Sequence, residues 1–303
     1  MRTVCLFFVL LLTLEAWPQT IRVRSVKRIT PENKESYLLT GVVPGSGHLL
    51  VAGEGYNGLS ILEPRRGRLT VISTEPGSGY EPSTTADGKK VFYRSDAMND
   101  NRKYSSVWCY DITTGGKELM IDKGRGVVPP AVAGNSVLLK TDNEMRVEQK
   151  GLSLKSGNEE TFVVIEEMMP VLYRGDERRE IMPNGNGFYI WASLSPDGTM
   201  ILYNYQGRGS YICDTDGTIL HELGRMNAPK WFNDRLVIGM DDKDDGHRIT
   251  SSDLVCYSLE EKRRTVLTNT PDRSEMFPFA SGNRKIAFCT EKGEIYIMKV
   301  RIR

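Results

Sequence analysis

The chain has 303 residues, with 40 Lys and Arg against 39 Asp and Glu, so its formal net charge is +1. This balance creates no overall field that would attract nucleic acid or an anionic membrane surface, and we expect neither as a partner. The 29 glycines and 39% apolar residues allow a sizeable core and favour many turns over long helices.

The first 19 residues have the pattern of a secretory signal peptide. Arg2 precedes an apolar run from Val4 to Leu14, which ends at Glu15. The run is shorter than the roughly 20 residues that span a bilayer, and it matches the apolar region of a signal peptide. We expect cleavage after Ala16 or Gln19; an uncleaved anchor or a buried first strand is the alternative. No later segment is apolar enough to cross a membrane, so the mature protein is predicted to be periplasmic or secreted.

One plan recurs six times along the rest of the chain. Each copy has a short segment that usually carries Pro, then a Gly, Asn or Asp turn, then four or five apolar residues, which is the pattern of a β-hairpin. The copies turn near Ser46, Asp87, Gly134, Asp197, Asn233 and Gly282, with gaps of 41, 47, 63, 36 and 49 residues. Periods of about 40–50 residues with strand-turn-strand content indicate the blades of a propeller.

Third and fourth strands follow in most copies, for example "SVWCYDI" from Ser106 and "KELMI" from Lys117. The sequence therefore predicts an all-β protein, a six-bladed β-propeller of four-stranded antiparallel blades, as a single domain over residues 20–303. The last copy ends at Arg303 after its third strand, and the segment from Ile21 to Thr30 is a spare strand. We expect this N-terminal strand to close the ring, because pairing there removes two exposed sheet edges.

The 63-residue gap indicates an insertion. "PVLYRGDERREIM" from Pro170 matches "SILEPRRGRLTVI" from Ser60 as a third strand, a charged turn and a fourth strand. On this alignment residues 143–167 are an insertion in blade three, either an extra hairpin on which partners dock or a longer loop.

The repeat resembles the Pro-Asp-type, WD40-like repeat of the TolB family. "SLSPDGTMILY" around Asp197 carries this resemblance, with "STTADGKKVFY" and "FASGNRKIAF" less close, and the similarity extends from about Tyr37 to Arg303. The resemblance implies a six-bladed propeller of the bacterial periplasm and, less directly, a binding hub for envelope proteins. The additional N-terminal domain of TolB has no counterpart, so partner binding through it cannot be transferred.

The Asp-Gly pair at Asp197 is interpreted as a corner. The residues at the same point of the other copies include Ser, Gly and Asn, which share turn geometry and no acid group. We therefore look for function at the channel and in the loops.

The central channel should be lined by the strands that open each copy. Its candidate binding residues place polar groups beside aromatic rings, which suits peptide or sugar recognition, although such rings also serve blade-to-blade packing. These residues are Tyr80, Glu81, Trp191, Lys230 and Trp231.

The segment "DDKDDGH" is the densest acidic loop and a candidate for contact with a partner or an ion. Its candidate residues are Asp241, Asp242, Asp244, Asp245 and His247. Calcium at Asp241 and Asp245 is possible, but EF-hand spacing fails because Lys243 occupies the third position. A solvated loop is the alternative.

No catalytic residues are assigned. There is no GxSxG elbow, and three histidines offer little material for a channel enzyme. "GEGYNG" from Gly53 fits GxGxxG, but a strand-like run follows it where a dinucleotide site needs a helix, so we expect no nucleotide cofactor. The four cysteines after the leader lie in apolar runs without CxxC spacing and are expected to be buried and free, namely Cys109, Cys213, Cys256 and Cys289.

The sequence thus favours an exported, non-catalytic propeller that binds protein or peptide partners in the cell envelope as a scaffold. The alternative is a glycan-binding sensor or a glycan-active lyase or hydrolase that uses the channel.

Overall fold

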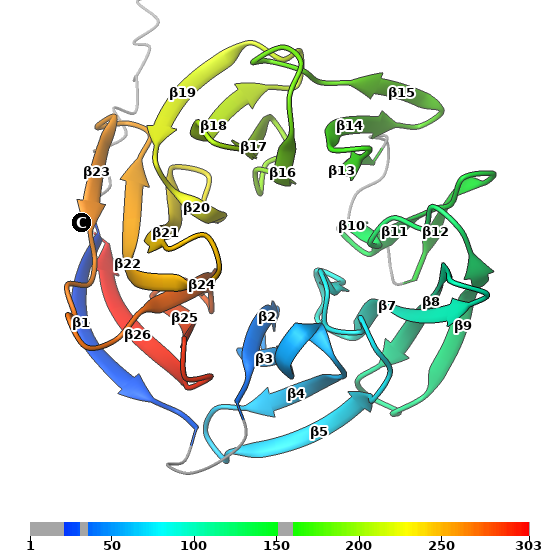
Figure 1. The fold of residues 1–303 in the computed structure, drawn as a ribbon, viewed down its shortest axis with the longest axis horizontal. Coiled ribbons are helices and arrows are strands. Elements are labelled where there is room, and N and C mark those ends of the chain that lie inside the picture. Colours follow the sequence, from blue (N-terminus) through cyan, green and yellow to red (C-terminus); the bar gives the residue numbers. More distant parts are fainter. Residues whose placement is uncertain (1–20, 31–35, 151–159, 303) are drawn as a thin grey trace, which may run out of the picture.

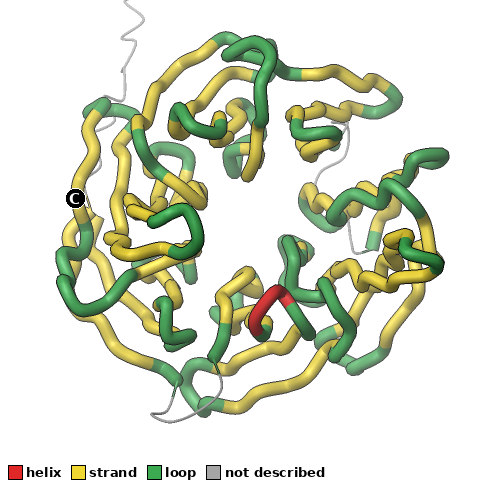
Figure 2. Tube along the Cα trace, viewed as in Figure 1, coloured by secondary structure: helices red, strands yellow, loops and turns green. Residues whose placement is uncertain are grey.

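The computed structural model describes residues 21–30, 36–150 and 160–302, and the expected signal peptide lies outside these ranges. Seven antiparallel sheets stand around a central channel in chain order, as Figure 1 shows. Almost all of the regular structure is strand, with one short helical turn (Figure 2). No helix in the described ranges is long and apolar enough to span a membrane.

Five of the sheets that the described residues form have four strands each. Their strands, from the channel outward, are β2 (Leu38–Val43), β3 (His48–Ala52), β4 (Leu59–Glu63) and β5 (Arg68–Ser73) in blade 1; β6 (Ser83–Thr84), β7 (Lys90–Asn99), β8 (Arg102–Asp111) and β9 (Lys117–Gly124) in blade 2; β16 (Tyr189–Leu194), β17 (Met200–Tyr205), β18 (Gly209–Asp214) and β19 (Ile219–Gly224) in blade 5; β20 (Asn227–Asn233), β21 (Leu236–Asp244), β22 (Ile249–Ser258) and β23 (Arg263–Val266) in blade 6; and β24 (Glu275–Ala280), β25 (Lys285–Thr290), β26 (Ile295–Ile302) and β1 (Ile21–Arg28) in blade 7. The short 3-10 helix η1 (Glu54–Tyr56) lies between β3 and β4.

The two remaining sheets have three described strands each and correct the sequence prediction. They are β10 (Ala131–Ala133), β11 (Ser136–Lys140) and β12 (Met145–Gln149) in blade 3, and β13 (Thr161–Glu166), β14 (Met169–Arg174) and β15 (Glu177–Glu180) in blade 4. The ring therefore has seven blades, and the prediction of six is wrong.

The cause of the error lies in residues 143–167, which were expected to be an insertion. Their described parts supply β12 as the third strand of blade 3 and β13 as the innermost described strand of blade 4, while residues 151–159 lie outside the description. Blade 4 has no hairpin with a Pro and a Gly, Asn or Asp turn before β13 in the described chain. The repeat was recognised in the sequence by that hairpin. Blade 4 lacks it among the described residues, so this sheet was not counted.

The Asp-Gly corners are confirmed as turns. Asp197 Oδ1 accepts hydrogen bonds from Ser195 Oγ at 2.5 Å and from the Thr199 N–H at 3.0 Å. Burial alone would raise the pKa of Asp197. The hydrogen bonds stabilise the carboxylate and lower that pKa. The backbone N–H of Asp197 donates to Asp234 Oδ1 of the next blade at 2.9 Å. The corner thus also ties blade 5 to blade 6.

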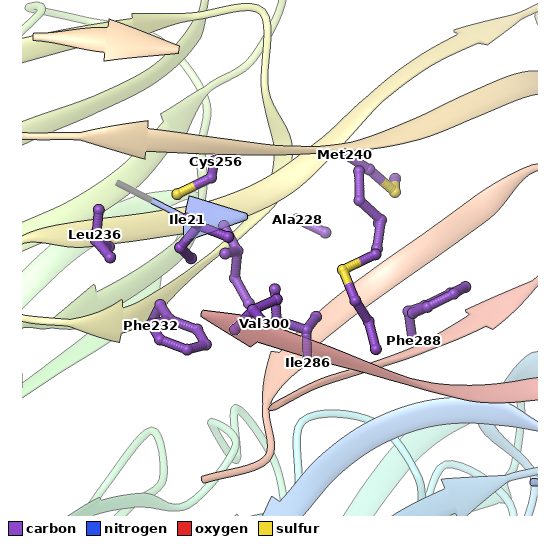
Figure 3. Packing of buried hydrophobic residues seen from close by; sticks show 12 residues of the cluster. Ile21, Ala228, Phe232, Leu236, Met240, Cys256, Ile286, Phe288 and Val300 are labelled. Atoms are coloured by element: carbon purple, nitrogen blue, oxygen red, sulfur yellow. The ribbon is translucent and has the colours of Figure 1, made fainter. Parts of the chain in front are cut away.

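The N-terminal strand closes the ring as predicted. β1 pairs antiparallel with β26, from Ile21 opposite Ile302 to Arg28 opposite Tyr296. Most β1 side chains are exposed, but Ile21 is buried in the cluster between blades 6 and 7 that Figure 3 shows, with Val300 and Cys256 nearby. Arg28 adds an ion pair with Glu294 at 2.9 Å.

The core lies between neighbouring blades, whose faces are apolar on both sides. Each of the four cysteines after the leader is buried in it as a free thiol, as the sequence predicted. Burial raises the pKa of Cys256 and of Cys289 to about 12, because the thiolate is poorly solvated there.

Candidate functional site

A cavity of about 1800 Å³ occupies the centre of the ring. Its walls are the innermost strands of the blades together with the segments that lead into them. All five channel residues that the sequence singled out line this cavity: Tyr80, Glu81, Trp191, Lys230 and Trp231. The structure thus brings together residues that are up to 151 positions apart in the chain.

Several residues of this wall have a strained backbone. Glu81, Trp191, Ala228 and Phe277 all have positive φ, of 48°, 55°, 44° and 50°. The last three lie in bulges of β16, β20 and β24, where the pairing register shifts. A bulky residue in this region costs about 1–3 kcal/mol, and such outliers gather at ligand sites. The bulges turn these side chains away from the ordinary alternation of a strand.

Tyr80 is held in place by neighbours from blades 1 and 2. Tyr56 of η1 meets its ring edge-on with 5.2 Å between ring centroids, and the Arg94 guanidinium lies 5.5 Å from the Tyr80 centroid. Arg94 is fixed in turn by Asp96 at 3.3 Å and by a 2.7 Å hydrogen bond to the Val127 carbonyl. Burial, and then the nearby Glu81 carboxylate, raise the pKa of Tyr80 to about 12.

Sequence reasoning missed Arg94 and Tyr56 as parts of this site. Arg94 follows the apolar residues of β7 and has no distinguishing motif, and Tyr56 lies inside the Gly-rich loop that leads into β4. Only the packing of blade 1 against blade 2 brings the two side chains to Tyr80.

Glu81 and Lys230 are opposite charges on different walls of the cavity. Glu81 precedes β6 in blade 2, and Lys230 lies in β20 of blade 6. Burial raises the pKa of Glu81 while Lys230 and Arg94 lower it in part, and burial lowers the pKa of Lys230 while Glu81 raises it in part. The Glu81 side chain is exposed towards the cavity, yet the protein packed around it makes desolvation the largest influence on its pKa.

The two charges influence each other without touching. Within the described chain, neither Glu81 nor Lys230 has an ion-pair partner within 4.0 Å, and the Lys230 ammonium lies 5.1 Å from the Phe279 ring centroid. A cation over an aromatic face is partly stabilised, by about 0.5–2 kcal/mol. The cavity therefore presents one carboxylate and one ammonium that could each accept a counter-charge from a ligand.

The two tryptophans are mainly packing residues. The Trp231 Nε1–H donates to the Ser193 carbonyl of blade 5 at 3.3 Å, and its ring packs on the cluster between blades 5 and 6. Trp191 packs against the cluster of blades 6 and 7 beside Phe277. Both rings still expose a part of their surface to the cavity.

The acidic loop lies apart from the cavity, in the hairpin of β21 and β22. It contains all five predicted partner or ion residues, namely Asp241, Asp242, Asp244, Asp245 and His247. Asp241 forms an ion pair with Arg264, and Asp242, only 6% exposed, accepts a 2.8 Å hydrogen bond from the Asn227 amide. These two carboxylates are already used in the fold.

The tip of this loop is a self-contained turn. Asp245 Oδ1 accepts hydrogen bonds from the backbone N–H groups of His247 and Arg248, each at 2.9 Å, and these bonds lower the pKa of Asp245. Asp244 Oδ1 likewise accepts the Gly246 N–H at 2.9 Å. Among the residues that the structure describes, no three His, Cys, Asp or Glu side chains converge on a possible metal position. Calcium at Asp241 and Asp245 stays a prediction without a geometric argument in its favour.

Comparison with known proteins identifies the fold alone. No protein-family model matches the chain, so none confirms a TolB-like family, and no curated protein sequence matches it. Among solved structures, the chain is similar to an oligogalacturonate lyase in complex with manganese, with 12% identity over 94% of this chain and 97% of that one and a TM-score of 0.51.

The chain is similar to two further solved structures at comparable identity. A chain of the mitotic checkpoint complex is 11% identical over 99% of this chain and 98% of that one, with a TM-score of 0.55. The β-propeller domain of Myceliophteria thermophila Cps50 (Swd1) is 11% identical over 93% of this chain and 100% of that one, with a TM-score of 0.59. At such identities the shared property is the β-propeller architecture.

Proposed function

We propose that this protein is a non-catalytic binding module that takes a peptide segment of a protein partner into its central channel. The observation that carries the proposal is the pair of channel charges, Glu81 and Lys230, which line the cavity from blades 2 and 6, with the Lys230 ammonium over the Phe279 ring. Both are desolvated by the surrounding protein, so a ligand that supplies a counter-charge to each would stabilise the charged forms.

A peptide fits this pair better than a glycan does. A peptide can bring a cation to Glu81 and an anion to Lys230, and its apolar side chains can cover Phe277 and Phe279. A neutral sugar brings no counter-charge to Glu81 or Lys230. An acidic sugar brings only negative charge, which Glu81 repels. The aromatic rings of Trp191 and Trp231 are what supports the alternative, a glycan-binding sensor or glycan-active enzyme.

We further propose that the protein acts outside the cytoplasm, as an envelope scaffold. The support for this location is the order of charge, apolar run and polar boundary in residues 1–19. The TolB-like repeat around Asp197 agrees with it, although no family model supports the resemblance.

Affinity capture with matched variants tests the proposal. The bait is the chain from residue 20 onward, as wild type and as the channel variant Glu81→Gln with Lys230→Gln. The control neutralises two exposed charges that do not line the cavity, Glu177→Gln with Lys299→Gln. We expect envelope proteins captured by wild type and control to be lost by the channel variant.

Equal capture by all three baits would contradict the channel as the site. A glycan array with the same three proteins and a Trp191→Ala variant tests the alternative. Glycan binding that is lost with Trp191→Ala and kept by the channel variant would favour a glycan ligand. Cleavage of a bound glycan would show that the protein is a glycan-active enzyme.

A further inference from the structure

Lys230 is the one lysine among the described residues that line the central cavity. The described wall carries one other cationic side chain, Arg174 of blade 4, and no histidine or cysteine. A guanidinium stays protonated in proteins, whereas a lysine amine can lose its proton and act as a nucleophile. A basic nitrogen that can attack a ligand is therefore found on this part of the wall at Lys230.

The strand that carries Lys230 is held on both sides. Within blade 6, β20 shifts its register with β21 after Asn227, and Lys230 then pairs with Ile238. The next residue, Trp231, donates its Nε1–H to the Ser193 carbonyl of blade 5 at 3.3 Å. A reactive side chain on such an element is positioned more precisely than a side chain on a loop.

The Lys230 side chain lies against an aromatic ring and has no counter-charge in contact. Its Nζ atom lies 5.1 Å from the centroid of the Phe279 ring in blade 7. No carboxylate of the described chain lies within 4.0 Å of this atom, and Glu81 acts on it from a greater distance. Burial lowers the pKa of Lys230, and Glu81 raises it in part. The side chain still reaches the cavity, where a small molecule can meet it.

These surroundings are those of an activated lysine. Proteins make a lysine amine nucleophilic by removing it from water in an apolar pocket. An ordinary lysine has about 0.04% free amine at pH 7, and each unit by which its pKa falls raises this share about tenfold. The apolar surface beside Lys230 continues from Phe279 to Phe277 and Trp191, which also line the cavity. A ligand with an apolar body can therefore pack next to the amine.

We propose that Lys230 captures aldehydes that have an apolar body, as a reversible imine. The amine nitrogen attacks the carbonyl carbon, the π electron pair of the carbonyl moves to its oxygen, and that oxygen takes a proton from the nitrogen. The hydroxyl group then leaves with the second proton of the nitrogen as water, and the C=N bond forms. One water is released, and the step needs no oxidant or reductant.

This inference goes beyond the proposed function, because it needs no peptide. The two uses of Lys230 belong to different protonation states of the same amine. A ligand carboxylate beside Lys230 stabilises the ammonium, which has no free electron pair and cannot attack a carbonyl. The free amine is the reactive form, so aldehyde capture is a property of the channel without a bound anion.

Reductive trapping on the wild-type protein from residue 20 onward tests the proposal. The protein is mixed at pH 7 with less than one equivalent of benzaldehyde and with sodium cyanoborohydride, which delivers hydride to the imine carbon and leaves N-benzyl-lysine. Mass spectrometry of peptides then compares Lys230 with the exposed Lys285 and Lys299. We expect about tenfold or more benzyl label at Lys230. All sites are compared within one sample, so no variant has to fold.

Two controls assign the label to the folded cavity. The preference for Lys230 should disappear when the protein is unfolded in guanidinium chloride. Lys230→Met should lose the fast phase of labelling and Lys299→Met should keep it, with melting curves confirming that both variants fold. Glycolaldehyde, which has a polar body, should show a smaller ratio of label at Lys230 to label at Lys299 than benzaldehyde does.

The outcomes separate this inference from the proposed function. Equal labelling of Lys230 and the exposed lysines would overturn aldehyde capture and leave the peptide proposal to its own capture experiment. A preference for Lys230 that persists in denaturant would also overturn it, as would equal ratios for the two aldehydes. Selective trapping at Lys230 together with equal protein capture by all three baits would support this inference and contradict the peptide proposal.

Discussion

Ile21→Ala should measure how much the closure strand contributes through its single buried side chain. Ile21 is 5% exposed and packs with Val300 of β26 and with Leu236 of blade 6. Removing three carbon atoms at about 0.8 kcal/mol each costs about 2.4 kcal/mol. The cavity left behind adds to this, so we expect a loss of about 2–4 kcal/mol in the free energy of unfolding.

This loss converts to a shift in melting temperature. An unfolding entropy of about 2.1 cal/mol/K per residue over about 280 residues gives about 0.6 kcal/mol/K, hence a fall of about 3–7 °C. Differential scanning calorimetry of the chain from residue 20 onward measures it. The matched control is Val26→Ala on the same strand, where the side chain is 38% exposed and the expected shift is below about 1 °C.

Equal shifts for the two variants would refute the reasoning, because β1 would then contribute through its backbone pairing alone. Deleting residues 21–28 removes the pairing with β26 as well as Ile21, so it should lower the melting temperature further than Ile21→Ala. An unchanged melting temperature after that deletion would count against closure of the ring by this strand.

Three further outcomes follow from buried or paired groups. The hydrogen bond from Lys90 holds the pKa of Asp111 at about 2, so this carboxylate stabilises the fold above pH 4, and its contribution is lost as the pH falls towards 2. Asp111→Asn should therefore melt lower than wild type at pH 6 and converge with it near pH 2, whereas a constant difference would argue against the pair. The four buried thiols should react with a thiol reagent at pH 8 only in denaturant, as spectrophotometric titration of the Cys5→Ser protein would show; fast native labelling would contradict their burial. Glu275 is fully buried, accepts a 2.9 Å hydrogen bond from Arg273 Nε and lies 2.8 Å from Arg273 Nη2 in an ion pair. Glu275→Gln should therefore cost about 2–4 kcal/mol in urea unfolding, and a loss below about 1 kcal/mol would mean that the pair is not needed.

The channel residues were predictable because they sit next to a repeated signal. Tyr80, Glu81, Trp191, Lys230 and Trp231 all belong to the segments that open a copy, and a propeller places those segments around its axis. The residue types at the channel could be predicted, but the distances between their charges could not. The sequence could not show that Glu81 and Lys230 lie too far apart to pair, because that distance depends on how blades 7 and 1 pack between blades 6 and 2.

The acidic loop shows the opposite case. Five charged or titratable residues in a row suggested a contact site, yet Asp241 and Asp242 bind Arg264 and Asn227. The partners lie 23 and 15 positions away in the chain, so only the folded hairpin and its neighbour reveal that these carboxylates are engaged.

Features that depend on neighbours along the chain could be predicted from the sequence. Hairpins, the Asp197 corner and the spare strand from Ile21 to Thr30 follow from turn chemistry and strand patterning, which act over a few residues. The division of the strands into sheets depends on long-range packing and was seen only in the folded chain. β12 and β13 follow one another along the chain but belong to different blades, because β12 pairs with β11 and β13 pairs with β14, and this division adds the seventh blade.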